Sequence, residues 1–183
     1  ELFTYAGRAL ADDLTVEALE PNYTVTYADD SRLTLSRDHA VMRRELERLE
    51  PGAFDKYQAY LRAGAAQMNA AMGRFAVTHY DDLASFVSPG TARDLLAARA
   101  YRSLAGHVAR YFRDERLRMA FSFQTMYLGL SPYDAPAIYG LLPYTELADG
   151  VFYTRGGMYQ IPLALERLAR ALGVTFEYGR AVT

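Results

Sequence analysis

A long stretch with almost no charge limits how this chain can fold more than any other feature of its sequence. From Met119 to Thr145 the only charged residue is Asp134, and aromatic residues recur throughout. Such a length would suit a helix that crosses a membrane. Pro132, Pro136 and Pro143 argue against this, because each removes a backbone donor and interrupts a helix where lipid offers no other partner. We therefore expect that the stretch does not span a membrane.

Two interpretations of this stretch remain open from its composition. It can form a well-packed core in which tyrosine hydroxyls reach polar partners. It can also form the wall of a long apolar cavity, or a patch that dips into the surface of a bilayer. The chain has 15 tyrosines and no tryptophan, which suits either interpretation.

The segments that precede this stretch carry clear local signals. Residues 23 to 35 place two β-prone runs on either side of Ala-Asp-Asp-Ser, which predicts a β-hairpin. Residues 38 to 50 have the pattern of an amphipathic helix. A second helix is expected from about residue 53 to 75, and its uncharged latter half predicts either burial on several sides or contact with an apolar space.

Further elements follow from the same kinds of signal. Helices are expected over residues 81–88, 91–100, 103–112, 114–129 and 161–172, and strands over residues 151–153 and 174–178. Gly173 is the expected stop of the last helix. The sequence therefore predicts a mainly helical α+β fold with a small antiparallel sheet.

Composition excludes several classes of function. The net charge is −2, and no basic stripe is interleaved with aromatic residues, so we expect no nucleic-acid partner. The absence of cysteine excludes disulfides, thiolate metal sites and cysteine nucleophiles. His39, His79 and His107 are too scattered to suggest ligands of one ion, so we predict no metal site.

Three blocks of the sequence are recognisable by their order and spacing. They run from Asp114 to Phe123, from Ser131 to Tyr139 and from Tyr144 to Met158. Together they resemble the central region of bacterial and fungal phytoene desaturases. The opening residues, Glu1 to Arg8, are similar to the stretch that follows the flavin-binding start of that family. Thr154 departs from the pattern, because many relatives have proline before the Arg-Gly-Gly of the third block.

The resemblance implies a flavoenzyme that removes hydrogen from a saturated bond of a carotene, with FAD as the acceptor. Residues 1–183 would be the substrate-binding domain, a helical insert excised from a Rossmann-type flavoprotein whose FAD-binding domain is absent here. The implied partners are a linear carotene such as phytoene and a membrane surface, with peripheral membrane association in the cytoplasm. Whether the protein forms a homo-oligomer stays open.

No two of the 13 glycines have the Gly-x-Gly spacing of a dinucleotide cradle, so this chain alone is expected to be inactive.

Three charged residues are the candidates for catalysis. Asp114 and Arg118 are four residues apart and so share a helix face. As an exposed ion pair they would mean little. The resemblance implies instead a pair at the flavin face, with Asp114 as proton acceptor and Arg118 as stabiliser of transient negative charge. Glu115, three residues before Arg118, is the alternative proton acceptor.

The resemblance also suggests where substrate and cofactor lie. The candidates that line the polyene path or its pocket are Phe121, Phe123, Met126, Tyr127, Leu130, Ile138, Leu142, Tyr144 and Glu146. The apolar ones serve equally well as plain core. Arg155, Gly156 and Gly157 are expected to bring backbone close to the flavin ring or substrate, since paired glycines permit close approach. An ordinary turn between strand and helix is the alternative there.

Competing functions remain open beside carotene desaturation. Within the same family, a relative that isomerises or oxidises polyenes would share these blocks. Outside it, a non-enzymatic helical module that binds a lipid or a partner protein would have the same composition.

Overall fold

The computed structural model describes residues 2–75, 79, 90, 91, 96 and 101–181. The chain divides into two compact units, one made of Glu1–Leu19 with Val151–Thr183 and the other of Glu20–Gly150. The helix expected from residue 81 lies outside the described residues. Of the helix expected over 91–100, only residues 91 and 96 are described.

The larger unit begins with the predicted hairpin. Strands β2 (Tyr23–Thr26) and β3 (Arg32–Leu35) pair antiparallel in a two-stranded sheet. Leu33 and Leu35 of β3 are fully buried. The turn is closed by the N–H of Tyr27, which donates to the carbonyl of Ser31 at 2.9 Å. The β-prone runs and the polar turn between them are thus confirmed as a hairpin.

Helix α3 (His39–Leu49) packs on this hairpin. The side chain of Asp38 caps its N-terminus, because Oδ1 accepts from the N–H groups of Ala40 at 2.7 Å and Val41 at 3.3 Å. Met42 and Leu46 lie on its buried face and join the core.

Helix α4 (Ala53–Ala70) follows and runs into a π-helical turn, η1 (Ala71–Phe75). In its uncharged half only Gly64 and Gln67 are buried, and this half packs on α9 (Leu141–Ala148) through Gly64. Ala66 and Asn69 are exposed, so the predicted burial on several sides is wrong. A Cβ added at Gly64 would lie 2.5 Å from the Cβ of Tyr144, so the close approach of these helices requires glycine.

An aromatic cluster forms the centre of this unit. Phe112 and Phe121 stack at a centroid distance of 4.6 Å and an interplanar angle of 12°. Tyr57 and Tyr60 of α4 contact the ring of Phe121, and the hydroxyl of Tyr60 donates to its carbonyl at 3.0 Å. Part of the uncharged stretch is therefore core, as one of the two interpretations proposed.

The single helix expected over residues 114–129 is wrong, because the chain breaks in the middle of it. Helix α8 (Glu115–Ala120) ends first, and a 3-10 helix, η2 (Phe123–Leu128), follows. At the break, Ser122 donates from its hydroxyl to the carbonyl of Arg118 at 2.7 Å, a bond that competes with helical geometry. Gly129, with φ of +67°, ends η2.

The helix expected over 103–112 is shorter than predicted, and loop residues hold it in place. It is α7 (Leu104–Val108), capped by Ser103. The N–H of Ala105 donates to the carbonyl of Pro132 at 2.8 Å. A short 3-10 helix, η3 (Ala137–Gly140), then leads into α9.

The smaller unit contains α1 (Leu2–Tyr5), α2 (Leu10–Asp13), β1 (Val16–Ala18), β4 (Phe152–Thr154) and α10 (Gln160–Ala171). Strands β1 and β4 pair antiparallel. Ala164 and Leu168 of α10 form a small buried cluster with Phe3 and Leu14. Gly173, with φ of +90°, follows α10 as predicted.

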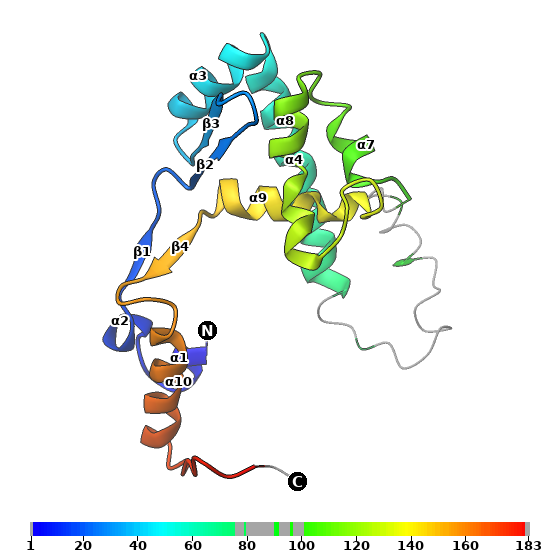
Figure 1. Ribbon diagram of the computed structural model, residues 1–183. Coiled ribbons are helices and arrows are strands. Elements are labelled where there is room, and N and C mark those ends of the chain that lie inside the picture. Colours follow the sequence, from blue (N-terminus) through cyan, green and yellow to red (C-terminus); the bar gives the residue numbers. More distant parts are fainter. Residues whose placement is uncertain (1, 76–78, 80–89, 92–95, 97–100, 182–183) are drawn as a thin grey trace. The chain divides into compact units, whose positions relative to one another are not determined.

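The strand expected over residues 174–178 is wrong, since these described residues form no strand. At the coarse level the α+β prediction is confirmed, with mostly helices and two small antiparallel sheets (Figure 1). Within the described part of the chain, no helix is both long and apolar enough to traverse a bilayer.

Candidate functional site

A surface cleft of about 850 Å³ lies in the larger unit beside α7 and α8. We call it the α7–α8 cleft. It is lined by Ser103, Ala105, Gly106, Ala109, Arg113, Glu115, Arg118, Met119, Ser122, Pro132 and Tyr133. Both arginines and the glutamate come from α8 or the residues just before it, so this short helix gives the cleft its charged wall.

Two of the three predicted catalytic residues meet in this cleft. Glu115 and Arg118 both line it and are both exposed. The Nε of Arg118 donates to the carbonyl of Phe112 at 2.8 Å, which fixes the base of the guanidinium group. A carboxylate and a guanidinium therefore share one wall.

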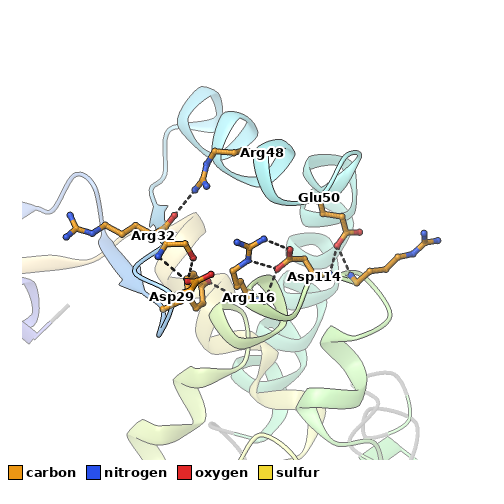
Figure 2. A network of polar contacts seen from close by, with 9 residues as sticks. Asp29, Arg32, Arg48, Glu50, Asp114 and Arg116 are labelled. Carbon is orange, nitrogen blue, oxygen red and sulfur yellow. Dashed lines mark hydrogen bonds and ion pairs between the residues drawn. The ribbon is translucent and has the colours of Figure 1, made fainter.

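Asp114 lies outside the cleft lining and has a different partner from the predicted one. It is the N-cap of α8, where its Oδ1 accepts from the N–H of Arg116 at 2.8 Å. Its Oδ2 accepts from the guanidinium of Arg116 at 2.8 Å, so the expected pair with Arg118 is corrected to a pair with Arg116 (Figure 2). Hydrogen bonding from Arg116 lowers the pKa of Asp114 below its ordinary value. The carboxylate is thus stabilised in its charged form.

The predicted polyene-lining residues fall into different environments. Phe121 is fully buried in the aromatic core and lines no described cleft. Phe123 is half-buried and packs edge-on against Tyr23 at 5.8 Å. Ile138 and Leu142 are also half-buried.

The remaining apolar candidates form an exposed surface. Met126 is 64% exposed and Tyr127 is 59% exposed, and Leu128 and Leu130 are exposed beside them in the chain. We call these four residues the η2 apolar surface. Pro132, which lines the α7–α8 cleft, is two positions beyond Leu130 in the sequence.

Glu146 is the centre of a polar cluster beneath η2. Its carboxylate accepts from the hydroxyl of Tyr23 at 2.6 Å and from the amide of Gln124 at 3.3 Å. Its carbonyl accepts from the side chain of Asn22 at 2.6 Å. Burial, together with the nearby Glu146, raises the pKa of Tyr127 to about 12. This cluster joins the hairpin, η2 and α9.

Tyr144, the weaker candidate beside Glu146, contacts a different part of the unit. Its Cβ faces Gly64 of α4, and the side chain is half-buried. It thus lies in the interface between α4 and α9.

Arg155, Gly156 and Gly157 belong to the smaller unit, whereas the cleft belongs to the larger. They form a turn after β4, and the two glycines have φ of +87° and +96°, which favour glycine. The Nε of Arg155 donates to the carboxylate of Glu17 on β1 at 2.8 Å. These contacts agree with the alternative of an ordinary turn, and proximity to a flavin stays a prediction.

Several residues of the site were not predicted from the sequence. Arg113, Met119, Ser122 and Tyr133 line the cleft, although only the last three fall within the recognisable blocks. Gln124 and its partners in the polar cluster are separated by long stretches of chain, so no local pattern signals their contact. Across the described ranges, no three histidine, aspartate or glutamate residues gather as ligands of a metal ion.

Comparison with known proteins gives the family. The model of the flavin containing amine oxidoreductases matches residues 1–183. The zeta-carotene-forming phytoene desaturase of Myxococcus xanthus is 46% identical over the whole chain, which covers 35% of that protein. The phytoene desaturase of Neurospora crassa is 33% identical, again over the whole chain and 31% of that protein. The 4,4'-diapolycopene oxygenase of a Methylomonas species is 35% identical over 94% of the chain and 35% of that protein.

The chain spans about a third of the length of these curated relatives. Because the family model covers every residue, the chain belongs to the flavin containing amine oxidoreductase family.

Proposed function

We propose that this chain is the substrate-binding part of an enzyme that introduces double bonds into a linear carotene such as phytoene. The observation that carries the proposal is the charged wall of the α7–α8 cleft, together with the four exposed apolar residues of the η2 apolar surface. The similar proteins, two phytoene desaturases and a 4,4'-diapolycopene oxygenase, support the same substrate class. We propose further that the flavin of the family is FAD, bound by a Rossmann-type domain elsewhere in a longer parent protein.

A linear carotene needs an apolar surface, because it has no group that could form strong hydrogen bonds. Met119 and Tyr133 offer exposed apolar atoms inside the cleft, and Met126 and Leu130 extend this character along the chain. Each square ångström of apolar surface covered by the ligand contributes about 25 cal/mol. Contact along this path would therefore provide most of the binding free energy.

The charged wall suits the chemistry of desaturation. Forming a double bond removes one hydrogen from each of two neighbouring carbons. One can leave as a proton to a carboxylate, and the other would leave with its electron pair as a hydride equivalent to the flavin of the family. We propose Glu115 as this proton acceptor and Arg118 as the group that stabilises transient negative charge. Asp114 is the weaker candidate, because its pair with Arg116 lowers its basicity.

The residues of this chain do not fit a dinucleotide cradle. None of its glycines has the spacing that lets backbone approach a pyrophosphate. These residues would therefore contact the substrate, and the pyrophosphate of FAD would be held by another part of the parent protein.

The η2 apolar surface also supports peripheral binding to a cytoplasmic membrane surface. Exposed apolar side chains with a tyrosine among them are typical of groups that enter the interface of a bilayer. A carotene dissolved in the membrane would then reach the cleft without crossing water.

The test is the full-length parent protein, supplied with FAD and phytoene in liposomes. Growth of red-shifted visible absorbance, with a product that has lost pairs of hydrogens by mass spectrometry, is the expected result. An unchanged mass with altered retention would indicate isomerisation. A gain of oxygen would indicate an oxygenase, the second candidate, which the Methylomonas relative favours. A parent that alters no polyene would overturn the proposal.

A further inference from the structure

Glu50 connects α3 to the start of α8. It is the C-cap residue of α3 and is only 8% exposed. Its Oε2 accepts from the backbone N–H of Arg113 at 2.7 Å and from that of Asp114 at 2.9 Å. The ammonium group of Lys56 pairs with its Oε1. Figure 2 shows Glu50 reaching the backbone beside Asp114.

These bonds offset the free-energy cost of burying the carboxylate of Glu50. A buried carboxylate destabilises the fold unless it is paired and hydrogen-bonded. Glu50 receives three donors, two of which come from backbone 63 and 64 residues further along the chain. One side chain thereby fixes the position of a distant peptide segment.

The segment that Glu50 holds is the one that builds the cleft wall. Arg113 lines the cleft itself, and Asp114 caps α8. Helix α8 is only six residues long, and it carries Glu115 and Arg118 into the cleft. A helix this short has little stability of its own, so its place depends on such contacts.

We propose that Glu50 is a positioning residue for the α7–α8 cleft, and that its two backbone hydrogen bonds hold the wall containing Arg113, Glu115 and Arg118. The inference rests on the proposed function for its consequence in catalysis. Its structural part, the ordering of residues 113–118, is measurable without any substrate.

The chain offers a matched control in Glu47. This residue also lies on α3, and its carboxylate also accepts two backbone N–H groups, from Gly52 at 2.7 Å and Phe54 at 3.0 Å. Those groups belong to the start of α4, away from the residues that line the cleft. Glu47→Ala therefore removes the same chemistry from the same helix without releasing α8.

The experiment uses the full-length parent and two measurements, amide hydrogen exchange over residues 113–118 and steady-state kinetics with phytoene. Glu50→Ala should accelerate exchange of these amides about tenfold or more, as expected when a buried acceptor is lost. It should lower kcat about tenfold with a smaller change in KM, because Met119 is the one apolar residue of the proposed path that lies on α8. Glu47→Ala should leave both quantities near their wild-type values even if it lowers the Tm.

Conservative variants keep the test decisive if Glu50→Ala fails to fold. Glu50→Gln retains a carbonyl oxygen for the two N–H groups but turns an amide toward Lys56. Adding Lys56→Met removes that conflict, so Glu50→Gln with Lys56→Met should restore slow exchange and kcat to within about threefold of wild type.

The inference is overturned if exchange over residues 113–118 and kcat are unchanged in Glu50→Ala. It is also overturned if Glu47→Ala produces the same local effect, or if the double variant rescues neither quantity. A wild-type parent with no desaturase activity would refute the proposed function alone, since hydrogen exchange would still decide the role of Glu50.

Discussion

The hydroxyl of Tyr23 donates a 2.6 Å hydrogen bond to the carboxylate of Glu146, 123 residues further along the chain. The bond joins the first strand of the hairpin to α9. Because Tyr23 is partly buried, burial raises its pKa well above the ordinary range, and the bond to Glu146 adds to the effect. The phenol thus keeps its proton and remains a donor.

Replacing this donor should weaken the larger unit. Tyr23→Phe leaves the carboxylate of Glu146 with one fewer hydrogen bond, and bonds to charged groups contribute about 1.5–3 kcal/mol. We expect a loss of that size in the free energy of unfolding, measured by urea titration. Tyr5→Phe, at an exposed position of the smaller unit, is the control. Equal stability of the two variants would show that the bond contributes nothing.

Phe121 should behave as a core residue. Phe121→Ala removes a ring stacked on Phe112 and contacted by Tyr57 and Tyr60, so a loss of about 3–5 kcal/mol is expected. Thermal unfolding followed by near-ultraviolet circular dichroism measures it. Met126→Ala, at an exposed position, should change stability by less than about 0.5 kcal/mol. A small effect at both positions would contradict the packing described for Phe121.

The η2 apolar surface should determine attachment to membranes. Replacing Met126 and Leu128 with serine removes exposed apolar area and should reduce the fraction of parent protein that co-floats with liposomes about fivefold or more. Tyr5→Ser, which removes an exposed ring elsewhere, is the matched control. If the double variant floats as well as wild type, this surface does not bind the membrane.

Glu115 and Asp114 should differ in their effect on turnover. Glu115→Gln removes the proposed proton acceptor and should lower kcat of the parent enzyme about a hundredfold or more. Asp114→Asn keeps an N-cap side chain, since asparagine caps helices as well as aspartate does, and should cost less than about tenfold. The reverse order would identify Asp114 as the acceptor.

Acid should weaken the cap of α8. In the unfolded chain Asp114 takes up a proton near pH 4, but pairing with Arg116 lowers the pKa of the folded state. The stability that it contributes is therefore complete above the unfolded pKa and is lost as pH falls through the folded one. Between pH 6 and about pH 3, the free energy of unfolding measured with urea should fall less for Asp114→Asn than for wild type. Equal declines for Asp114→Asn and wild type would show that the pair with Arg116 contributes nothing to this pH dependence.

Elements with local signals were predictable from the sequence. The hairpin from Tyr23 to Leu35 and the helices α3 and α4 follow from alternation, apolar periodicity and the break at Pro51-Gly52. In each, neighbouring residues determine both the element and its ends.

Elements that depend on distant partners were predicted less well. The break after Ala120 interrupts an apolar pattern that continues without change, and it coincides with the bond from Ser122 to the carbonyl of Arg118. Residues 174–178 have the composition of a strand, but a strand needs a neighbour to pair with. The partners of Glu146 come from two separate segments, residues 22–23 and residue 124, and only the fold brings them to it.

The sequence predicted the charged residues of α8 that line the cleft, but not the partners of Asp114 and Glu50. Glu115 and Arg118 follow from the first recognisable block, and they do meet in a cleft. The partner of Asp114 was predicted from a four-residue spacing, but capping geometry brings Arg116 closer. Glu50 gave no local signal, because its bonds depend on how α3 and α8 are placed.

Lys56 is the only lysine in the sequence, and it pairs with Glu50. Acylating reagents therefore find one side-chain amine in these 183 residues, and it is the amine that pairs with the Glu50 carboxylate. Acetylation there would neutralise the ammonium and leave Glu50 with its backbone donors alone. Labelling at this single position thus removes the ion-pair partner of the cleft-wall anchor without a mutation, and a mass spectrum shows how far it has proceeded.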